Sequence, residues 1–326
     1  MTPRIGVVAP PDLAVDQFVP FARRAERLGY DELWVVEDCF YQGGIAQAAV
    51  ALARTERIRV GVGILPAGAR NPAFACLDLA TLANLFPGRL LVGIGHGMPG
   101  WMRQTGAWPA SPLTLLREYL GAVRSILAGE RVTVSGDYVR LRDVRLEGPP
   151  RQVPPVFAGV RGPRSLAMSA ELADGTILAE PVTPEYLRAV RKHTDTAGRP
   201  HEIVAYNVAA VDDSADRARA VARQSLLAIG DPEWAPHIAP LPFADEFVAL
   251  SATATSREQF AASLPDAWVD QLAVVGTPAG ARARLAELAT AGADHLVLIP
   301  AGPDALAGLE SLARVLPAVS SGGSPR

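Results

Sequence analysis

Short, almost wholly apolar segments alternate with longer amphipathic segments along the chain. Residues 5–9 have the pattern of a buried strand. In residues 15–28, apolar side chains recur three or four positions apart, which predicts a helix that Gly29 ends. The same alternation predicts strands over 33–36, 58–65, 90–94, 156–158, 176–179, 203–211 and 295–299, and helices over 44–54, 74–86, 113–128, 163–173, 184–196, 278–291 and 303–316. Eight such units with apolar strands predict a closed parallel TIM (β/α)8 barrel, for which an open doubly wound sheet is the main rival.

Two segments depart from this alternation. Residues 131–146 contain two short strand-like runs around Ser135-Gly-Asp137, which predicts a β-hairpin excursion. Residues 212–276 predict a helical insertion after the seventh strand, with a proline-rich middle. We expect one domain over residues 1–319 and a disordered tail over 320–326.

Composition mainly excludes classes of function. The formal net charge of −3 argues against a general polyanion binder, so we expect a small-molecule substrate and no nucleic acid. No uncharged apolar run approaches the roughly 20 residues that span a bilayer, so no membrane partner is expected. Cys39 and Cys76 form no paired motif, which favours the cytoplasm. The histidines show no metal-ligand spacing, and we predict no metal.

The active site of a parallel barrel lies at the carboxyl ends of its strands. Glu37 and Asp38 follow the second strand, and their side chains point to opposite sides, so only one is expected to face the barrel mouth. There it would relay a proton, with a pKa raised by burial. The alternative is a carboxylate that caps the next helix or pairs with an arginine.

Two further strand ends carry candidate residues. Gly95-His96-Gly97 follows the fourth strand, and an exposed histidine on pliable backbone suits proton transfer near neutral pH, although it could equally bond a loop carbonyl. Gly63 and Ile64 end the third strand, where glycine permits close approach of a flat ligand or simply a bulge. Glu180 ends the sixth strand.

The clearest physical reason for a binding site lies in the run Gly159-Val160-Arg161-Gly162-Pro163. Pro163 suits the first turn of a helix, so Gly162 lies at the helix entry, where free backbone N–H groups attract an anion. Arg161 adds positive charge. The run therefore predicts a phosphate site, with a merely well-capped helix as the alternative.

Several stretches resemble the luciferase-like monooxygenase superfamily. The stretch from Ala25 to Asp38, AERLGYDELWVVED, resembles its second-strand signature, and Pro87 to Gly95 resembles its fourth-strand signature. Gly162-Pro163 with Ala173-Asp-Gly-Thr-Ile-Leu178 resembles its fifth-helix and sixth-strand signature. The likeness is strong over roughly residues 4–211, and it is greatest for the branch that uses coenzyme F420, which includes enzymes similar to methylenetetrahydromethanopterin reductase.

The resemblance implies a bacterial luciferase-like barrel with specific site residues. It implies a cofactor phosphate on residues 159–163, a ring backed by a non-proline cis peptide at Gly63–Ile64, and an acid role for Glu37 or Asp38. The dehydrogenase-like members follow that acid with histidine, whereas Asp38 occupies the position here, which argues against sugar-phosphate oxidation. The family also suggests a homodimer.

Three hypotheses of function follow. The first is an F420-dependent oxidoreductase that transfers hydride between the deazaflavin and an organic substrate, with His96 or the Glu37/Asp38 pair moving the proton. The second is an FMN-dependent monooxygenase supplied with reduced flavin by a partner. The third is a flavin-binding barrel without catalysis.

Overall fold

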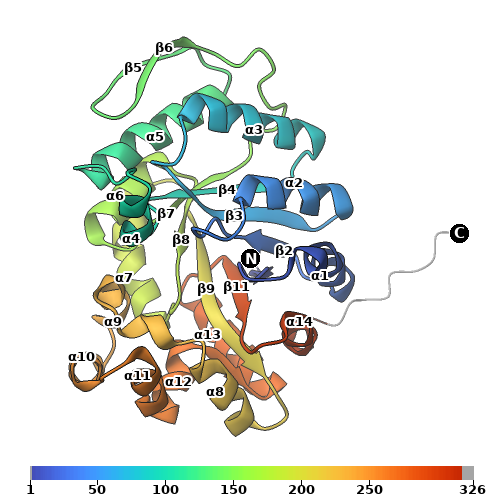
Figure 1. The fold of residues 1–326 in the computed structure, drawn as a ribbon, viewed down its shortest axis with the longest axis vertical. Helices are drawn as coiled ribbons and strands as arrows, with labels where there is room; N and C mark the ends of the chain where they lie inside the picture. Colours follow the sequence, from blue (N-terminus) through green and yellow to red (C-terminus); the bar gives the residue numbers. More distant parts are fainter. Residues whose placement is uncertain (1, 318–326) are drawn as a thin grey trace, which may run out of the picture.

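The structure is a computed structural model that describes residues 2–317. Eight parallel strands form a closed barrel (Figure 1). They are β1 (Arg4–Val8), β2 (Glu32–Val35), β3 (Arg59–Pro66), β4 (Leu90–Gly95), β7 (Val156–Gly159), β8 (Gly175–Leu178), β9 (Glu202–Val211) and β11 (His295–Pro300). Each strand pairs with the next one in this order, including β8 with β9, and the last strand, β11, pairs with β1. The sheet therefore closes into a ring. The predicted TIM barrel is confirmed.

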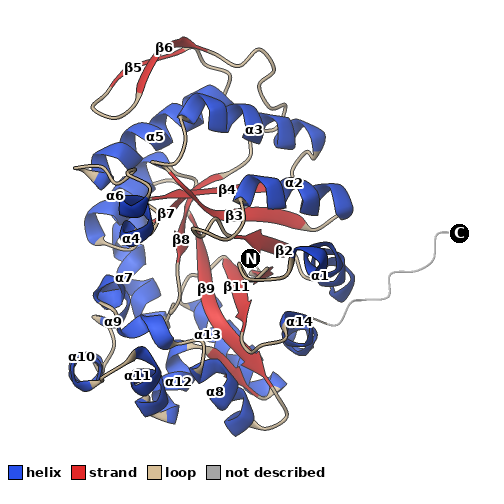
Figure 2. Cartoon of the chain, in the orientation of Figure 1, coloured by secondary structure: helices blue, strands red, loops and turns tan. Residues whose placement is uncertain are grey.

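Eight helices cover the outside of the barrel (Figure 2). They are α1 (Val15–Leu28), α2 (Gly44–Arg54), α3 (Pro72–Leu85), α5 (Pro112–Leu127), α6 (Pro163–Leu172), α7 (Pro184–Thr194), α13 (Pro278–Thr290) and α14 (Ala305–Leu312). Helix α1 shows the logic of these elements: Phe18, Phe21, Ala22 and Ala25 form its buried face, and Gly29 ends it in the left-handed conformation at φ 93°.

The hairpin and the insertion are both present. Strands β5 (Val132–Ser135) and β6 (Arg140–Val144) pair antiparallel at the edge of the molecule, as predicted (Figure 1). The insertion after β9 contains α8 (Ala215–Arg223), α9 (Ala235–Ile238), α10 (Ala244–Thr253), α11 (Arg257–Ser263), α12 (Asp266–Leu272) and the 3-10 turns η2 (Leu227–Gly230) and η3 (Pro232–Trp234). Two 3-10 turns, η1 (Asp195–Ala197) and η4 (Ala313–Val315), extend helices of the barrel.

Two short elements correct the sequence reading. Between the predicted strand 90–94 and the predicted helix 113–128, where the sequence pattern indicates no element, lies helix α4 (Pro99–Gln104). The end of the insertion, expected to be helical, forms strand β10 (Val274–Gly276), which pairs with the far end of β9. The tail expected over 320–326 lies outside the described residues, and the single domain over 1–319 stays a prediction.

Three aromatic side chains pack together among aliphatic ones in the barrel interior. Trp34 packs edge-on against Phe157 and Tyr206, with ring centroids 6.4 and 5.7 Å apart. Val36, Ile64 and Ile299 pack on this cluster and remain partly exposed. The interior is therefore a solid core that supports the barrel mouth.

Candidate functional site

The carboxyl ends of the strands bring most of the predicted residues to one end of the barrel. Asp38 follows β2, His96 follows β4, Arg161 follows β7 and Glu180 follows β8. The charges of Asp38 and Arg161 both act on the Glu180 carboxyl, and that of Arg161 acts on His96. These four side chains therefore form one electrostatic group.

Glu37 turns away from this group. Its carboxylate accepts two hydrogen bonds from the Arg70 guanidinium, at 2.7 and 3.0 Å, and a third from the backbone N–H of Gly44 at the start of α2. Glu37 thus pairs with an arginine and caps a helix, which was the alternative raised for one of the two acids. Asp38 is left as the acid that faces the mouth.

Asp38 and Glu180 are carboxyls without a basic hydrogen-bond partner. Within residues 2–317 neither side chain forms an ion pair, and the structure gives neither a hydrogen bond to another side chain. Burial raises the pKa of Asp38. Burial also raises the pKa of Glu180, and the charge of Asp38 adds to this, whereas Arg161 opposes it. Both carboxyls are therefore biased toward the protonated acid.

His96 is partly buried beside Arg161. Burial lowers the pKa of the imidazole and the nearby guanidinium lowers it further, whereas a hydrogen bond to the backbone of Pro112 opposes them. A neutral imidazole keeps one nitrogen free to accept a proton. Gly97, which follows it, has φ 71°, a left-handed conformation that favours glycine.

The entry to α6 presents free N–H groups. Gly162 precedes the helix without a side-chain cap, and Pro163 occupies the first helical position. The Ser165 hydroxyl donates to the Gly162 carbonyl, so it does not occupy the amides of the first turn. Because the half-buried Arg161 lies two residues before Pro163, this end of α6 suits a phosphate. Of the other residues in the run, Val160 is buried and Pro163 is exposed.

Ile64 forms an apolar floor between strands. The peptide bond between Gly63 and Ile64 is cis, as predicted, and the β3–β4 register shifts there. A Cβ atom at Gly159 would lie 2.5 Å from the Ile64 side chain, and one at Gly95 would lie 3.1 Å from it and 2.7 Å from the Gly159 carbonyl oxygen. These two glycines therefore leave room for the Ile64 side chain. The register shift at Gly63 agrees with the bulge that was the alternative raised for this glycine.

The sequence reading missed a group of residues that hold the site in place. The Tyr206 hydroxyl is buried and has no hydrogen-bond partner among the residues that the structure describes. It lies so close to Gly63 that a Cβ there would be 2.2 Å away. A tyrosine within the aliphatic run of β9 was the available signal. The Tyr186 hydroxyl donates to the Arg161 carbonyl at 3.0 Å.

The insertion also contacts this end of the barrel. Trp234 Nε1 donates to the Glu180 carbonyl at 2.5 Å, and its ring lies 4.9 Å from the Arg161 guanidinium. The buried His237 imidazole lies 3.1 Å from the Pro181 carbonyl oxygen. Within residues 2–317, no group of three or more histidine, cysteine or acidic side chains could hold a metal ion. None of the described helices is long and apolar enough to cross a membrane.

Known proteins share both the sequence and the fold. A 5,10-methylenetetrahydromethanopterin reductase from Methanolobus tindarius is 26% identical over 311 residues, covering 92% of this chain and 95% of the relative. An F420-dependent glucose-6-phosphate dehydrogenase from Amycolatopsis mediterranei is 29% identical over 308 residues, covering 88% and 89%. The solved coenzyme F420-dependent tetrahydromethanopterin reductase from Methanopyrus kandleri has the same fold, with a TM-score of 0.80 at 20% identity over 96% of this chain and 98% of that one.

The family itself is given by a match that spans most of the chain. The model of the luciferase-like monooxygenase family covers residues 3–295, which include seven of the eight barrel strands and the first residue of the eighth, β11. The chain therefore belongs to the luciferase-like monooxygenase family and is an oxidoreductase.

Proposed function

We propose that this protein is an F420-dependent oxidoreductase that transfers hydride between the deazaflavin and an organic substrate. The observation that carries the proposal is the Ile64 floor, which lies across Gly95 and Gly159 next to the uncapped entry of α6. An apolar floor beside an anion site suits a planar ring that bears a phosphate. Relatives whose names specify F420 support this cofactor over FMN.

The residues present fit such a group. The amides at the start of α6 and the Arg161 guanidinium would hold the phosphate, and Ile64 would back the ring. Bound there, the deazaflavin would supply the hydride acceptor or donor of the reaction. Asp38 and Glu180 would hold a proton on a carboxyl oxygen, because burial favours their acid form, and the neutral His96 would accept one.

A binding comparison tests the cofactor. The purified protein is titrated with F420 and, separately, with FMN, and the fluorescence of each ligand is followed. We expect a Kd for F420 of about 10 µM or lower and at least about tenfold weaker binding of FMN. Tighter binding of FMN would favour the monooxygenase, and weak binding of both would overturn the proposal. Turnover of bound F420 by candidate substrates separates an enzyme from a passive binder.

Arg161→Gln tests the phosphate site. Loss of a charge-assisted hydrogen bond of about 1.5–3 kcal/mol should weaken F420 binding roughly tenfold or more. Arg188→Gln is the matched control, because Arg188 is an exposed arginine that pairs with Glu185 on the surface of α7. Equal affinities of the two variants would show that Arg161 does not hold the phosphate.

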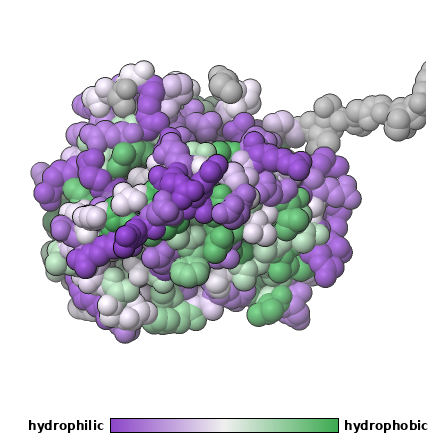
Figure 3. Space-filling model, turned by 90° about the horizontal axis from the view of Figure 1, so that it is seen from above, coloured by the Kyte–Doolittle hydropathy of each residue, from purple (hydrophilic) through white to green (hydrophobic). Residues whose placement is uncertain are grey.

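We also propose a homodimer that forms through α3. Phe74, Leu77 and Leu85 are 68%, 52% and 65% exposed, although the opposite face of the same helix is buried in the core. Figure 3 looks onto the end of the molecule where α3 and the hairpin lie, and shows apolar residues in several groups among polar ones.

We further propose that the protein works in the cytoplasm. The free thiols of Cys39 and Cys76 suit that reducing compartment.

Light scattering on a gel-filtration column tests the dimer. The native chain should elute with about twice the monomer mass, and Leu77→Glu should shift it to the monomer because a charge in the interface is left unpaired. Val248→Glu, at an exposed apolar position on α10, should leave the dimer intact. A monomeric native chain would contradict this part of the proposal.

A further inference from the structure

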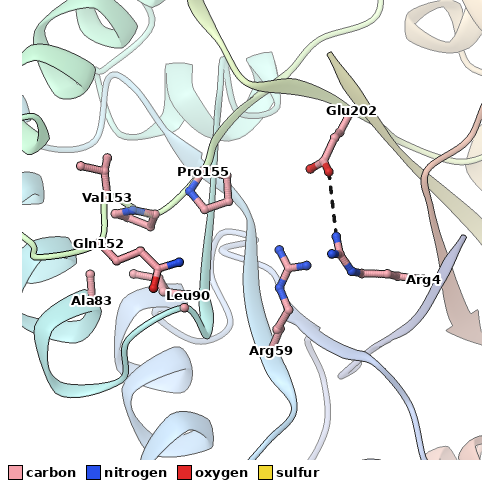
Figure 4. A pocket seen from close by; sticks show the side chains of 10 residues that line it. Arg4, Arg59, Ala83, Leu90, Gln152, Val153, Pro155 and Glu202 are labelled. Atoms are coloured by element: carbon pink, nitrogen blue, oxygen red, sulfur yellow. Dashed lines mark ion pairs between the residues drawn. The ribbon is translucent and has the colours of Figure 1, made fainter. Parts of the chain in front are cut away.

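The amino-terminal end of the barrel, opposite the proposed cofactor site, carries a second polar group. The first residues of five barrel strands are polar or charged: Arg4, Glu32, Arg59, Glu202 and His295. A hollow of about 420 Å³ opens beside them, lined by Arg4, Arg59, Glu202 and Gln152 together with apolar side chains (Figure 4). In Figure 4 the Arg59 guanidinium and the Gln152 amide point into the space that faces Arg4.

The donors that line this hollow lack acceptors. Within residues 2–317 the structure gives no hydrogen bond from the side chains of Arg4, Arg59 or Gln152, and the Nε atom of Arg59 is fully buried without a partner. Their ion pairs are long, 3.9 Å from Arg4 to Glu202 and 3.4 Å from Arg59 to Glu32. The neighbouring Arg89, in contrast, makes four hydrogen bonds. Buried donors are normally satisfied, so the buried Nε atom of Arg59 is the one that lacks an acceptor here.

The nearby carboxylates are already engaged by other groups. The Glu32 carboxylate accepts from His295 at 2.9 Å and from the Trp34 indole at 2.9 Å. The Glu202 carboxylate lies 3.3 Å from the other imidazole nitrogen of His295. Asp31 accepts from the backbone N–H of Ile5 and does not line the hollow.

The wall of the hollow is therefore left with a surplus of positive charge. Two of its charged side chains are arginines, and Glu202 is the only carboxylate among the described residues that line it. Burial lowers the pKa of Arg59 most, and the charge of Arg4 lowers it as well, although the nearby carboxylates, Glu32 foremost, oppose this. The two guanidinium groups therefore repel each other. A single anion between them would relieve this repulsion.

We propose that this hollow binds a small organic carboxylate. Its carboxylate would lie between the guanidinium groups of Arg4 and Arg59, each of which can donate two parallel hydrogen bonds. Its carbon body would lie against Leu90, Val153 and Pro155. The volume lies within the range of small-molecule sites, roughly 300–1,000 Å³. The site is independent of the cofactor at the other end of the barrel.

Calorimetry with benzoate and benzamide tests the site. The two probes share shape but differ in charge, and inorganic phosphate is the third probe, all in a buffer free of carboxylate and phosphate and with no cofactor present. We expect benzoate to bind in about the millimolar range and at least about tenfold more tightly than benzamide or phosphate. No benzoate binding, equal binding of benzoate and benzamide, or tighter binding of phosphate would each overturn the proposal.

Three variants place the binding in this hollow. Arg4→Gln removes a half-exposed arginine with only a long ion pair, so we expect it to fold and to weaken benzoate binding at least about fivefold. Val153→Trp fills the hollow without a change in charge and should also weaken it. Arg57→Gln removes an exposed arginine outside the hollow and should leave the Kd within about twofold. Equal effects of Arg4→Gln and Arg57→Gln would overturn the site.

Discussion

Ile64 depends on two glycines that lie on neighbouring strands. Its side chain occupies the space that a Cβ atom of Gly159 or Gly95 would need. The floor under the proposed cofactor therefore consists of the Ile64 side chain, which fits because Gly95 and Gly159 have no side chain. A methyl group added at either glycine would force the Ile64 side chain to move.

Gly159→Ala tests this arrangement. The added Cβ would meet Ile64 Cγ2 at 2.5 Å, and because a β-branched side chain yields little, we expect a loss of about 1–3 kcal/mol in the free energy of unfolding. F420 affinity should fall as well, since the floor moves. Urea denaturation and the F420 titration measure the two effects.

Gly121→Ala is the control, because it should change the free energy of unfolding in the opposite direction. Gly121 lies within α5 with no atom near its virtual Cβ, so alanine should raise the stability by about 0.5–1 kcal/mol and leave F420 binding unchanged. If Gly159→Ala were as harmless as Gly121→Ala, Ile64 would not form the floor.

The adjacent acids Glu37 and Asp38 show how far a sequence goes at this scale. Strand alternation predicts that only one of them faces the mouth, and this is what the structure has. Which one cannot be read from the sequence, because the Arg70 that engages Glu37 lies 33 residues further along the chain. Two adjacent carboxylates look alike in the sequence, and only the contacts formed in the folded protein show which of them is engaged by an arginine.

At the scale of elements, the insertion is attached to the site by a few contacts of the segment from Glu233 to His237. Arg161 Nη1 donates to the Glu233 carbonyl at 3.1 Å, and the Tyr186 ring packs against His237 at a tilt of 35°, with ring centroids 4.3 Å apart. Trp234 adds its indole bond to Glu180. This segment therefore fixes both Arg161 and the strand end that carries Glu180.

Trp234→Phe tests the attachment. It keeps an aromatic ring over Arg161 but removes the indole N–H, so it should cost about 1 kcal/mol locally. We expect faster hydrogen exchange of backbone amides in residues 227–265, measured by mass spectrometry, with the barrel strands unchanged. Trp268→Phe, which retains stacking on Phe243 and loses no hydrogen bond given for the described residues, should have a smaller effect.

Most barrel elements were predictable because their strands have at least four residues and their helices at least eight, which is long enough to show an apolar pattern. Helix α1 and helix α2 have the predicted bounds. Helix α4 has six residues and strand β10 three, too few to show a period. Strand β10 exists because β9 extends beyond the barrel and offers a free edge to Val274–Gly276, which is a tertiary cause.

At the scale of the whole molecule, the barrel closes over a buried ionic cluster. Glu32 and His295 are both fully buried and lie 263 residues apart in the chain, on β2 and β11. The sequence reading gave His295 no role, because its partner becomes adjacent only when the ends of the barrel meet. A polar residue at the start of five separate strands was the signal that the cluster left in the sequence.

The cluster makes stability depend on pH in a known direction. Burial alone would lower the pKa of His295, but hydrogen bonds to Glu202 and Glu32 outweigh it and raise the pKa to about 9. The ordinary value is near 6.5, so the protonated imidazole contributes fully below about pH 6.5, and the contribution is lost as the pH rises through 9. Between pH 6.5 and 8 the loss is on the order of 1.5 kcal/mol.

The comparison of native chain and His295→Gln isolates this effect. Burial lowers the pKa of His96, of His201 to about 4 and of His237 to about 3, so these residues add stability as the pH rises through 6.5. They are shared by both proteins and cancel in the difference. The free energy of unfolding is measured in urea at pH 6.5 and pH 8. From pH 6.5 to pH 8, that of the native chain should fall by about 1.5 kcal/mol relative to that of His295→Gln. His193→Gln should follow the native chain, and the same pH dependence in all three proteins would mean that His295 is not protonated in the folded barrel.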